Sequence, residues 1–296
     1  MKIKIIGAGL AGCEAALCLA ERGVRVELYD IKPEKFTPAH KSANFSELVC
    51  SNSLKSNDVY ANACGLLKEE MRILGSHIIS AADKCRVPAG AALAVDREAF
   101  ADTVTREVCA NKNIEVICAE ADKVPDEWAV VATGPLTSGP LAEDIRGICG
   151  GELHFYDASA PIVSRDSIDI EKTFEGGRYG RGGDDYLNCP MNKEEYEHFV
   201  SELVRAERAD LHEFEKREIF EGCMPVEVLA SRGTDSLRFA MLKPVGLTDK
   251  YGNKFYAVLQ LRKENAESTA YNLVGFQTNL KFGEQRRVFS MIPALA

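Results

Sequence analysis

The N-terminal residues "KIKIIGAGLAG" carry three glycines, Gly7, Gly9 and Gly12, in the spacing G-x-G-x-x-G. An apolar, β-branched run at residues 3–6 precedes them, and helical apolar spacing follows over residues 10–22. In such a turn the first glycine permits a tight bend and the second lets a pyrophosphate approach the backbone. The third glycine lets helix and strand pack closely. The sequence therefore predicts the strand, turn and helix that open a dinucleotide-binding fold.

A second strand over residues 24–30 ends at Asp30, where a carboxylate can accept hydrogen bonds from ribose hydroxyls. Farther along, "VVATG" predicts a strand that leads into Gly134, which suits a second contact to the same dinucleotide and favours FAD over NAD(P). The alternative to a dinucleotide-binding turn at the N-terminus is a glycine-rich turn in another α/β fold. The expected cofactor-binding residues are Gly7, Ala8, Gly9, Leu10, Ala11, Gly12, Asp30, Lys32 and Gly134.

The rest of the chain predicts two domains. Residues 31–60 are polar and loop-like, and from about residue 150 the texture changes to loops rich in glycine and aromatic residues. We expect a nucleotide-binding domain over residues 1–150 and a second domain over 151–296. Further elements are expected in this order: a helix at 65–84, a helix from about Asp96, a strand at 114–118, a charged helix at 193–218, and strands at 255–261 and 271–276.

Charge and hydropathy exclude some classes of function. The net charge of −9 argues against a surface that is basic throughout. Residues 223–296 nevertheless carry 10 Lys and Arg against 6 Asp and Glu, which is either a local phosphate-binding region or chance asymmetry. The apolar runs are too short to cross a bilayer, and no signal peptide is recognisable. We expect a cytoplasmic protein with no membrane partner.

The ten cysteines include no C-x-x-C pair and no Cys/His group with the spacing of zinc ligands, so we expect no metal site. Most should be small buried thiols in a reducing compartment. Two lie in loop-like strings, Cys50 in "LVCSNS" and Cys223 in "EGCMP". Either is a candidate for reactive thiol chemistry or for a structural role. The loop "GGRYGRGGDD" offers Arg178 and Arg181 for anion contact, with a solvated loop as the alternative.

Strings along the whole chain resemble the folate- and FAD-dependent tRNA (uracil-C5-)-methyltransferase family, which makes 5-methyluridine in the T-loop, at position 54, of tRNA. They are "IGAGLAGCEAA", "SELVCSNSLKSN", "VPAGAALAVDREAF", "FYDASAPIV", "YGRGGDDYLNCPM", "FEGCMPVEV", "DSLRFAMLKPVGL" and "YNLVGFQTNLKFGEQRRVF". Strings of this length are far more specific than a glycine fingerprint.

The resemblance implies a mechanism. In the family a thiolate adds to C6 of uracil, which makes C5 nucleophilic toward a one-carbon unit. That unit comes from methylenetetrahydrofolate by way of reduced FAD, and NAD(P)H re-reduces the flavin. The family's nucleophile motif matches Cys223, and a second family cysteine beside the flavin matches Cys50. Possible contacts to tRNA phosphates are Arg178, Arg181, Lys281, Arg286 and Arg287.

The resemblance also implies a fold. We expect an α/β protein with a Rossmann-like FAD-binding domain, of the two-dinucleotide-domain flavoprotein type, and an inserted α+β domain for folate and tRNA. The family's chains continue beyond the position of Ala296, so the C-terminal return to the FAD domain is expected to be missing. Three alternatives stay open: the same chemistry on ribosomal RNA, a non-catalytic flavin- or RNA-binding fragment, and a generic NAD(P)-dependent oxidoreductase.

Overall fold

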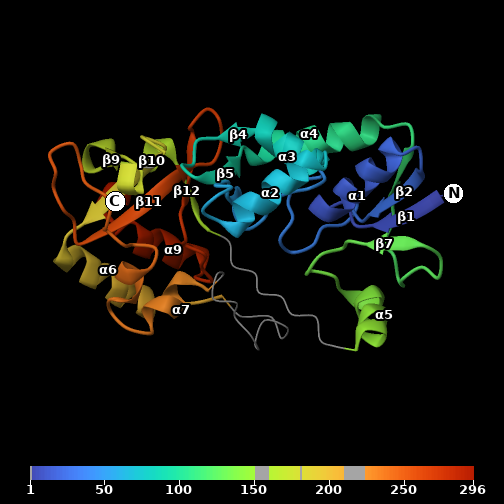
Figure 1. The fold of residues 1–296 in the computed structure, drawn as a ribbon. Coiled ribbons are helices and arrows are strands. Elements are labelled where there is room, and N and C mark those ends of the chain that lie inside the picture. The colour runs from blue at the N-terminus through green and yellow to red at the C-terminus, as the bar shows by residue number, and fades with distance from the viewer. Residues whose placement is uncertain (1, 151–159, 181, 210–223) are drawn as a thin grey trace. The chain divides into compact units, whose positions relative to one another are not determined.

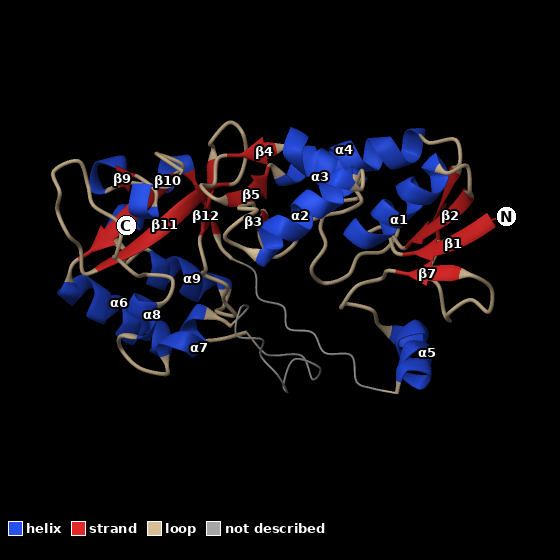
Figure 2. Cartoon of the chain, in the orientation of Figure 1, coloured by secondary structure: helices blue, strands red, loops and turns tan. Residues whose placement is uncertain are grey.

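The computed structural model describes residues 2–150, 160–180, 182–209 and 224–296 (Figure 1). The chain divides into two compact units, each containing both helices and strands (Figure 2). Unit 1 comprises Met1–Val49, Asn57–Cys85 and Val95–Phe155. Unit 2 comprises Cys50–Ser56, Arg86–Ala94 and Tyr156–Ala296. The predicted boundary near residue 150 placed segments 50–56 and 86–94 in the first domain, whereas in the structure they belong to unit 2.

Unit 1 is built on a parallel sheet with the strand order β6-β2-β1-β7. Its strands are β1 (Lys2–Ile6), β2 (Arg25–Asp30), β6 (Ile114–Cys118) and β7 (Ala129–Val131). Helix α1 (Leu10–Glu21) connects β1 to its parallel neighbour β2, so the predicted strand, turn, helix and strand are confirmed. Parallel strands need a long crossover connection, usually a helix, and this parallel sheet with its crossover helix confirms the α/β, Rossmann-type fold class.

The other helices of unit 1 are α2 (Ala63–Ile73), α3 (His77–Lys84), α4 (Arg97–Ala110) and α5 (Gly139–Cys149). The single helix predicted at 65–84 is thus wrong, because Gly75 adopts a φ of 79° and ends α2. Ser76 then caps α3 by accepting a hydrogen bond from the backbone N–H of Ile79. Among the helices in the described ranges, none is both long and apolar enough to span a membrane.

Unit 2 contains a five-stranded antiparallel sheet with the order β8-β12-β11-β10-β9. Its strands are β8 (Ile162–Ser164), β9 (Phe174–Glu175), β10 (Tyr186–Met191), β11 (Ala257–Lys263) and β12 (Ala270–Leu273). A three-stranded sheet, ordered β3-β5-β4, is formed by β3 (Ser53–Ser56), β4 (Arg86–Val87) and β5 (Ala92–Val95). The two segments from the first half of the chain supply these short strands.

The α-helices described after residue 160 are α6 (Lys193–Arg205), α7 (Val226–Ala230), α8 (Ser236–Phe239) and α9 (Phe282–Phe289). Short 3-10 turns are η1 (Arg165–Ser167), η2 (Ile170–Lys172), η3 (Arg178–Gly180) and η6 (Pro293–Leu295). The predicted start of the charged helix is correct, because Asn192 and Glu195 form a capping box there. Its predicted extent to residue 218 is wrong: α6 ends at Arg205, where Ala206 turns to extended backbone (ψ 144°).

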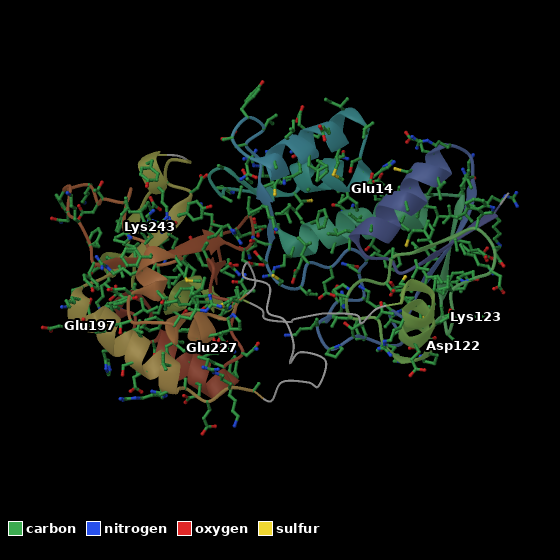
Figure 3. The ribbon with its side chains drawn as sticks, turned by 60° about the horizontal axis from the view of Figure 1, so that its bottom comes forward. Glu14, Asp122, Lys123, Glu197, Glu227 and Lys243 are labelled. Carbon is green, nitrogen blue, oxygen red and sulfur yellow. The ribbon has the colours of Figure 1, made fainter. Side chains whose placement is uncertain are left out.

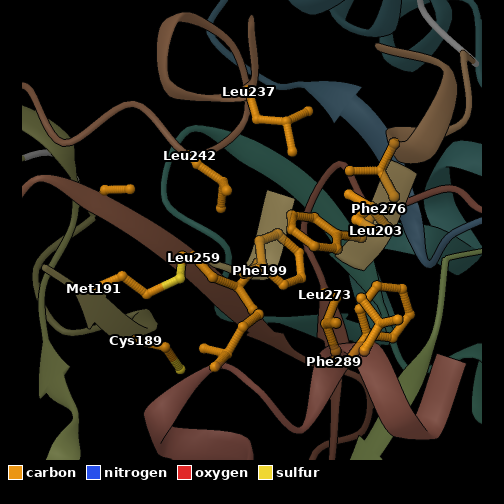
Figure 4. Packing of buried hydrophobic residues seen from close by; sticks show 14 of the residues in the cluster. Cys189, Met191, Phe199, Leu203, Leu237, Leu242, Leu259, Leu273, Phe276 and Phe289 are labelled. Carbon is orange, nitrogen blue, oxygen red and sulfur yellow. The ribbon is translucent and has the colours of Figure 1, made fainter. Parts of the chain in front are cut away.

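The core of unit 2 lies between α6 and one face of the five-stranded sheet (Figure 4). Phe199 and Leu203 of α6 and Leu259 of β11 are fully shielded from solvent. Phe276 and Phe289 add an edge-to-face pair with ring centroids 5.7 Å apart. This side of β11 is therefore an ordinary apolar core face.

A buried carboxylate anchors the start of α7. Glu227 is fully buried and accepts hydrogen bonds from the Thr278 hydroxyl (2.8 Å) and the Asn279 backbone N–H (2.9 Å) (Figure 3). The N–H of Val226 also donates to the Gln277 carbonyl at 2.7 Å. Residues 224–227 are consequently held to residues 277–279, directly after the segment that carries Cys223.

We predict that Glu227→Ala lowers the free energy of unfolding by about 3 kcal/mol, because it removes the carboxylate that accepts from the buried Thr278 hydroxyl and the half-buried Asn279 N–H. Glu197→Ala is the matched control, since Glu197 lies on the surface and forms an ion pair with Lys193 at 3.7 Å. That control should change stability by less than about 0.5 kcal/mol. Chemical denaturation of both variants measures the difference, and equal losses would show that the Glu227 hydrogen bonds do not anchor the segment.

Candidate functional site

The glycine turn of unit 1 is sterically constrained at its first and third glycines. Gly7 adopts a φ of 100°, and a Cβ there would lie 2.5 Å from the Ala132 carbonyl oxygen. A Cβ on Gly12 would lie 1.8 Å from the Gly7 carbonyl oxygen. Both contacts are far inside van der Waals distance, so the packing of β1, β7 and α1 requires glycine at these two positions.

At Gly9, neither the backbone conformation nor the surrounding packing requires glycine. Its backbone is extended (φ −76°, ψ −170°), a conformation open to any residue. Among the described residues other than its chain neighbours, a Cβ at Gly9 would meet no atom nearer than the Ala132 oxygen at 4.0 Å. The missing side chain therefore leaves room at the N-terminus of α1 for a group from outside the chain. A pyrophosphate fits this space, since the helix N-terminus favours negative charge.

Asp30 ends β2 beside this turn. One carboxylate oxygen accepts a hydrogen bond from the Ala8 backbone N–H at 2.7 Å, and the other accepts from the Lys32 backbone N–H at 2.9 Å. A carboxylate has about four acceptor sites, so capacity remains for ribose hydroxyls. The structure thus joins Asp30 to the glycine turn, as the dinucleotide interpretation requires.

A loop that sequence reasoning left without a role covers the turn. The backbone N–H of Ser46 donates to the Ala8 carbonyl at 2.9 Å, with Ser46 in the left-handed region (φ 52°). The buried Lys32 ammonium donates to the Asn44 carbonyl and lies 4.0 Å from the Glu47 carboxylate. Residues 44–47 therefore pack against the turn. Their contacts are mostly made by backbone atoms, so no side-chain motif marked them.

Gly134 lies at the same end of the sheet. Strand β7 pairs in parallel with β1, so both strands end at the same edge. Gly134 follows β7 with a φ of 73°, and a Cβ on Gly7 would lie 2.8 Å from the Cα of Thr133. The two predicted cofactor segments, around Gly7 and Gly134, are consequently brought side by side.

The cysteines sort by environment. Burial raises the pKa of the Cys13 and Cys189 thiols to about 12, so neither is suited to nucleophilic chemistry near neutral pH. Cys50 is half-buried, and Cys223 lies outside the described residues. Three of the described cysteines are exposed: Cys109, Cys118 and Cys149. Within the described ranges, no three His, Cys, Asp or Glu side chains gather into a group able to hold a metal ion.

Cys50 is the first residue of a segment bound to the sheet of unit 2. Its carbonyl accepts a hydrogen bond from the Ala160 N–H at 3.4 Å. The next two residues contact the buried Arg262 of β11: Nη2 donates to the Ser51 hydroxyl at 2.7 Å, and Nε donates to the Asn52 side-chain oxygen at 2.9 Å. Asn52 is fully buried and donates to the Lys263 carbonyl at 2.9 Å.

Four of the five predicted phosphate-binding cations lie in described parts of unit 2, on η3 or at α9. Arg178, on η3, is half-buried and donates to the Gln260 side chain at 2.9 Å and to the Lys243 carbonyl. Burial lowers the pKa of Arg178.

The other described cations of this set belong to α9 or precede it. Lys281 pairs with Glu207 at 2.8 Å, and Arg287 pairs with Glu202 at 2.6 Å and Glu284 at 2.8 Å. Arg286 is exposed, and Arg181 lies outside the described residues.

The chain matches known proteins over nearly its whole length. A family model described as glucose inhibited division protein A matches residues 2–296. The methylenetetrahydrofolate–tRNA-(uracil-5-)-methyltransferase TrmFO of Acetivibrio thermocellus is 58% identical over 296 residues, which cover 99% of this chain and 68% of the relative. The proteins of the same name from Desulforamulus reducens and Moorella thermoacetica are each 57% identical over 297 residues, covering 67% and 68% of those relatives.

Solved structures agree on the fold. GidA of Aquifex aeolicus in its form I crystal superposes with a TM-score of 0.68 at 13% sequence identity, and the form II crystal gives 0.67 at 14%. The match covers 99% of this chain but only 55% and 53% of those chains, so the chain spans about half their length. The chain belongs to the glucose inhibited division protein A family and, within it, to the folate-dependent tRNA (uracil-5-)-methyltransferases.

Proposed function

We propose that the chain takes part in folate- and FAD-dependent methylation of C5 of a uridine in the tRNA T-loop, at position 54. The observation that carries this proposal is the 58% identity to a named tRNA (uracil-5-)-methyltransferase over 99% of the chain. The product is 5-methyluridine. Uracil, methylenetetrahydrofolate, NAD(P)H and one proton balance against 5-methyluracil, tetrahydrofolate and NAD(P)⁺.

The glycine turn supports FAD as the bound cofactor. Gly9 leaves space at the N-terminus of α1, where backbone N–H groups can receive the pyrophosphate. Asp30 has acceptor capacity for the ribose hydroxyls, and Gly134 lies at the same sheet edge as a second backbone contact. When bound, FAD supplies the reducing equivalents and the carrier for the one-carbon unit.

Two thiols share the remaining work in this proposal. The Cys223 thiolate adds to C6 of uracil, and the electron pair of the C5–C6 bond moves toward O4 as an enolate. C5 then attacks the one-carbon unit. Loss of the C5 proton to a base breaks the bond between the one-carbon unit and its carrier and leaves an exocyclic methylene on C5. A hydride equivalent from the reduced cofactor would convert this methylene to methyl, and the Cys223 thiolate leaves as the C5–C6 double bond re-forms. Cys50 acts beside the flavin, in protecting it or in acid/base chemistry, whereas Cys13 and Cys189 are excluded by burial.

Arginine and lysine side chains of unit 2 are proposed to hold the RNA backbone, because phosphate contacts position a substrate. Among the described residues, Arg178 donates to neutral oxygens of Gln260, Lys243 and Val245, and its charge can therefore attract an anion. Arg286 is exposed on α9. Lys281 and Arg287 pair with carboxylates, and a phosphate would compete with those pairs.

We predict that Gly9→Ala and Gly12→Ala separate cofactor binding from folding. Gly9→Ala should lower stability by less than about 1 kcal/mol but remove most of the bound flavin, because the new methyl group occupies the pyrophosphate space. Gly12→Ala should destabilise the chain by about 3 kcal/mol, since the backbone must shift to relieve the clash. Flavin absorbance and thermal unfolding measure the two effects. A Gly9→Ala variant with full flavin content would contradict the assignment.

We predict that Cys223→Ala retains flavin but loses methylation of a tRNA T-loop transcript by at least about a thousandfold. Cys50→Ala should also lower the rate, and Cys109→Ala, which removes an exposed thiol, should leave it unchanged. Incorporation of labelled one-carbon units from methylenetetrahydrofolate into the transcript is the assay. A normal rate in Cys223→Ala would remove this residue as nucleophile. If a ribosomal RNA transcript is labelled in preference to the tRNA transcript, the substrate is ribosomal RNA. If the chain fails to bind added FAD, the cofactor assignment is wrong.

A further inference from the structure

The five-stranded sheet of unit 2 has two chemically different faces. Leu259 and Leu261 of β11 point into the apolar core, while the alternate residues Gln260 and Arg262 point to the opposite face. Their cross-strand partners are polar as well: Asn188 pairs with Gln260, and Asn272 pairs with Arg262. These four polar side chains are all at most 8% exposed. The second face is therefore a buried polar layer.

A buried polar layer is an unusual choice for stability alone. Apolar side chains of the same volume stabilise a sheet interface as well or better, because burying polar groups requires compensating hydrogen bonds. What such a layer provides is a fixed arrangement of its partners. Here the side chains are linked: Gln260 donates to Asn188 at 3.1 Å, and Arg262 contacts the Asn272 side-chain oxygen at 3.4 Å.

Arg262 also donates to the segment that begins with Cys50. Its Nε and Nη2 hold Asn52 and Ser51, which lie more than two hundred residues away in sequence. Asn52 returns a hydrogen bond to the backbone of β11 through the Lys263 carbonyl. The guanidinium is a rigid planar fork, so holding two neighbouring residues at once fixes the direction of the chain as well as its distance.

We propose that Arg262 is the positioning residue for Cys50. It fixes Ser51 and Asn52, and through them the orientation of the adjoining half-buried thiol. This assignment rests on the proposed role of Cys50 in methylation. The arginine touches neither substrate nor cofactor in this role; it determines where the Cys50 backbone runs.

The test compares Arg262→Met with Arg262→Lys in the full chain. Site-resolved alkylation by iodoacetamide and amide hydrogen exchange report on the Cys50 segment. In Arg262→Met, exchange across residues 51–56 and alkylation of Cys50 should each become about tenfold faster, because the segment opens more often. Arg262→Lys retains one charged donor and should restore part of the protection. Alkylation of the exposed Cys109 and of the buried Cys189 should stay unchanged.

Arg178→Met is the matched control. It removes a half-buried arginine that donates a hydrogen bond to Gln260 of the same polar layer. The other hydrogen bonds of Arg178 go to the carbonyls of Lys243 and Val245 and not to the Cys50 segment. It should leave Cys50 alkylation at the parent rate. An equal increase in both variants would show a general loosening of unit 2 and overturn the assignment to Arg262.

Ser51→Ala keeps the proposal testable if Arg262→Met does not fold. It removes only the 2.7 Å hydrogen bond at a half-buried hydroxyl and should accelerate Cys50 alkylation by about threefold. If Cys50 is alkylated at the parent rate in a folded Arg262→Met, the proposal is wrong. If Arg262→Met does not fold, the same result in Ser51→Ala would overturn it. These measurements need no RNA. If the chain fails to methylate RNA but Arg262→Met still accelerates Cys50 alkylation, the proposed function is rejected and the structural role of Arg262 is retained.

Discussion

The two-sided character of β11 is the constraint on which unit 2 depends. One side of the strand contributes leucines to the core beneath α6, and the other side contributes Gln260 and Arg262 to a buried polar layer. Strand alternation makes both possible within seven residues, because successive side chains point to opposite faces. Burial of the apolar side drives folding. The polar side forms hydrogen bonds with a segment that is distant in sequence and so determines which segment packs on this face of the sheet.

These hydrogen bonds explain why two segments from the first half of the chain belong to unit 2. Segments 50–56 and 86–94 interrupt the sequence of unit 1 and are built into unit 2. Arg262 holds the first segment, and its cross-strand partner Tyr186 donates to the Ala89 carbonyl of the second at 2.8 Å. The Asp185 carboxylate adds a hydrogen bond from the Gly90 N–H at 2.6 Å. A cysteine that would otherwise lie in a polar loop is thus attached to a rigid sheet, which is what ordered thiol chemistry requires.

Local sequence patterns predicted those parts of unit 1 whose structure has a local cause. The β1-turn-α1-β2 unit follows from glycine spacing and apolar periodicity, and Asp96 marked the start of α4 because a cap acts through its nearest neighbours. The break at Gly75 was missed, since an isolated glycine is also tolerated inside a helix. The overlong helix predicted after Lys193 failed for a similar reason: charged residues beyond Arg205 have high helix propensity, but propensity is only a weak prior.

The sequence alone determined the glycine turn, its acidic partner Asp30 and the membership of the chain in its family, because each rests on residue type and short-range spacing. Only the tertiary structure decided that Gly9, unlike Gly7 and Gly12, leaves unfilled space, since that depends on where the Ala132 backbone runs. It also decided that Lys281 and Arg287 are paired with carboxylates and that Arg262 reaches the Cys50 segment. These contacts join residues far apart in sequence, and such pairings arise from packing of the whole unit and not from any local pattern.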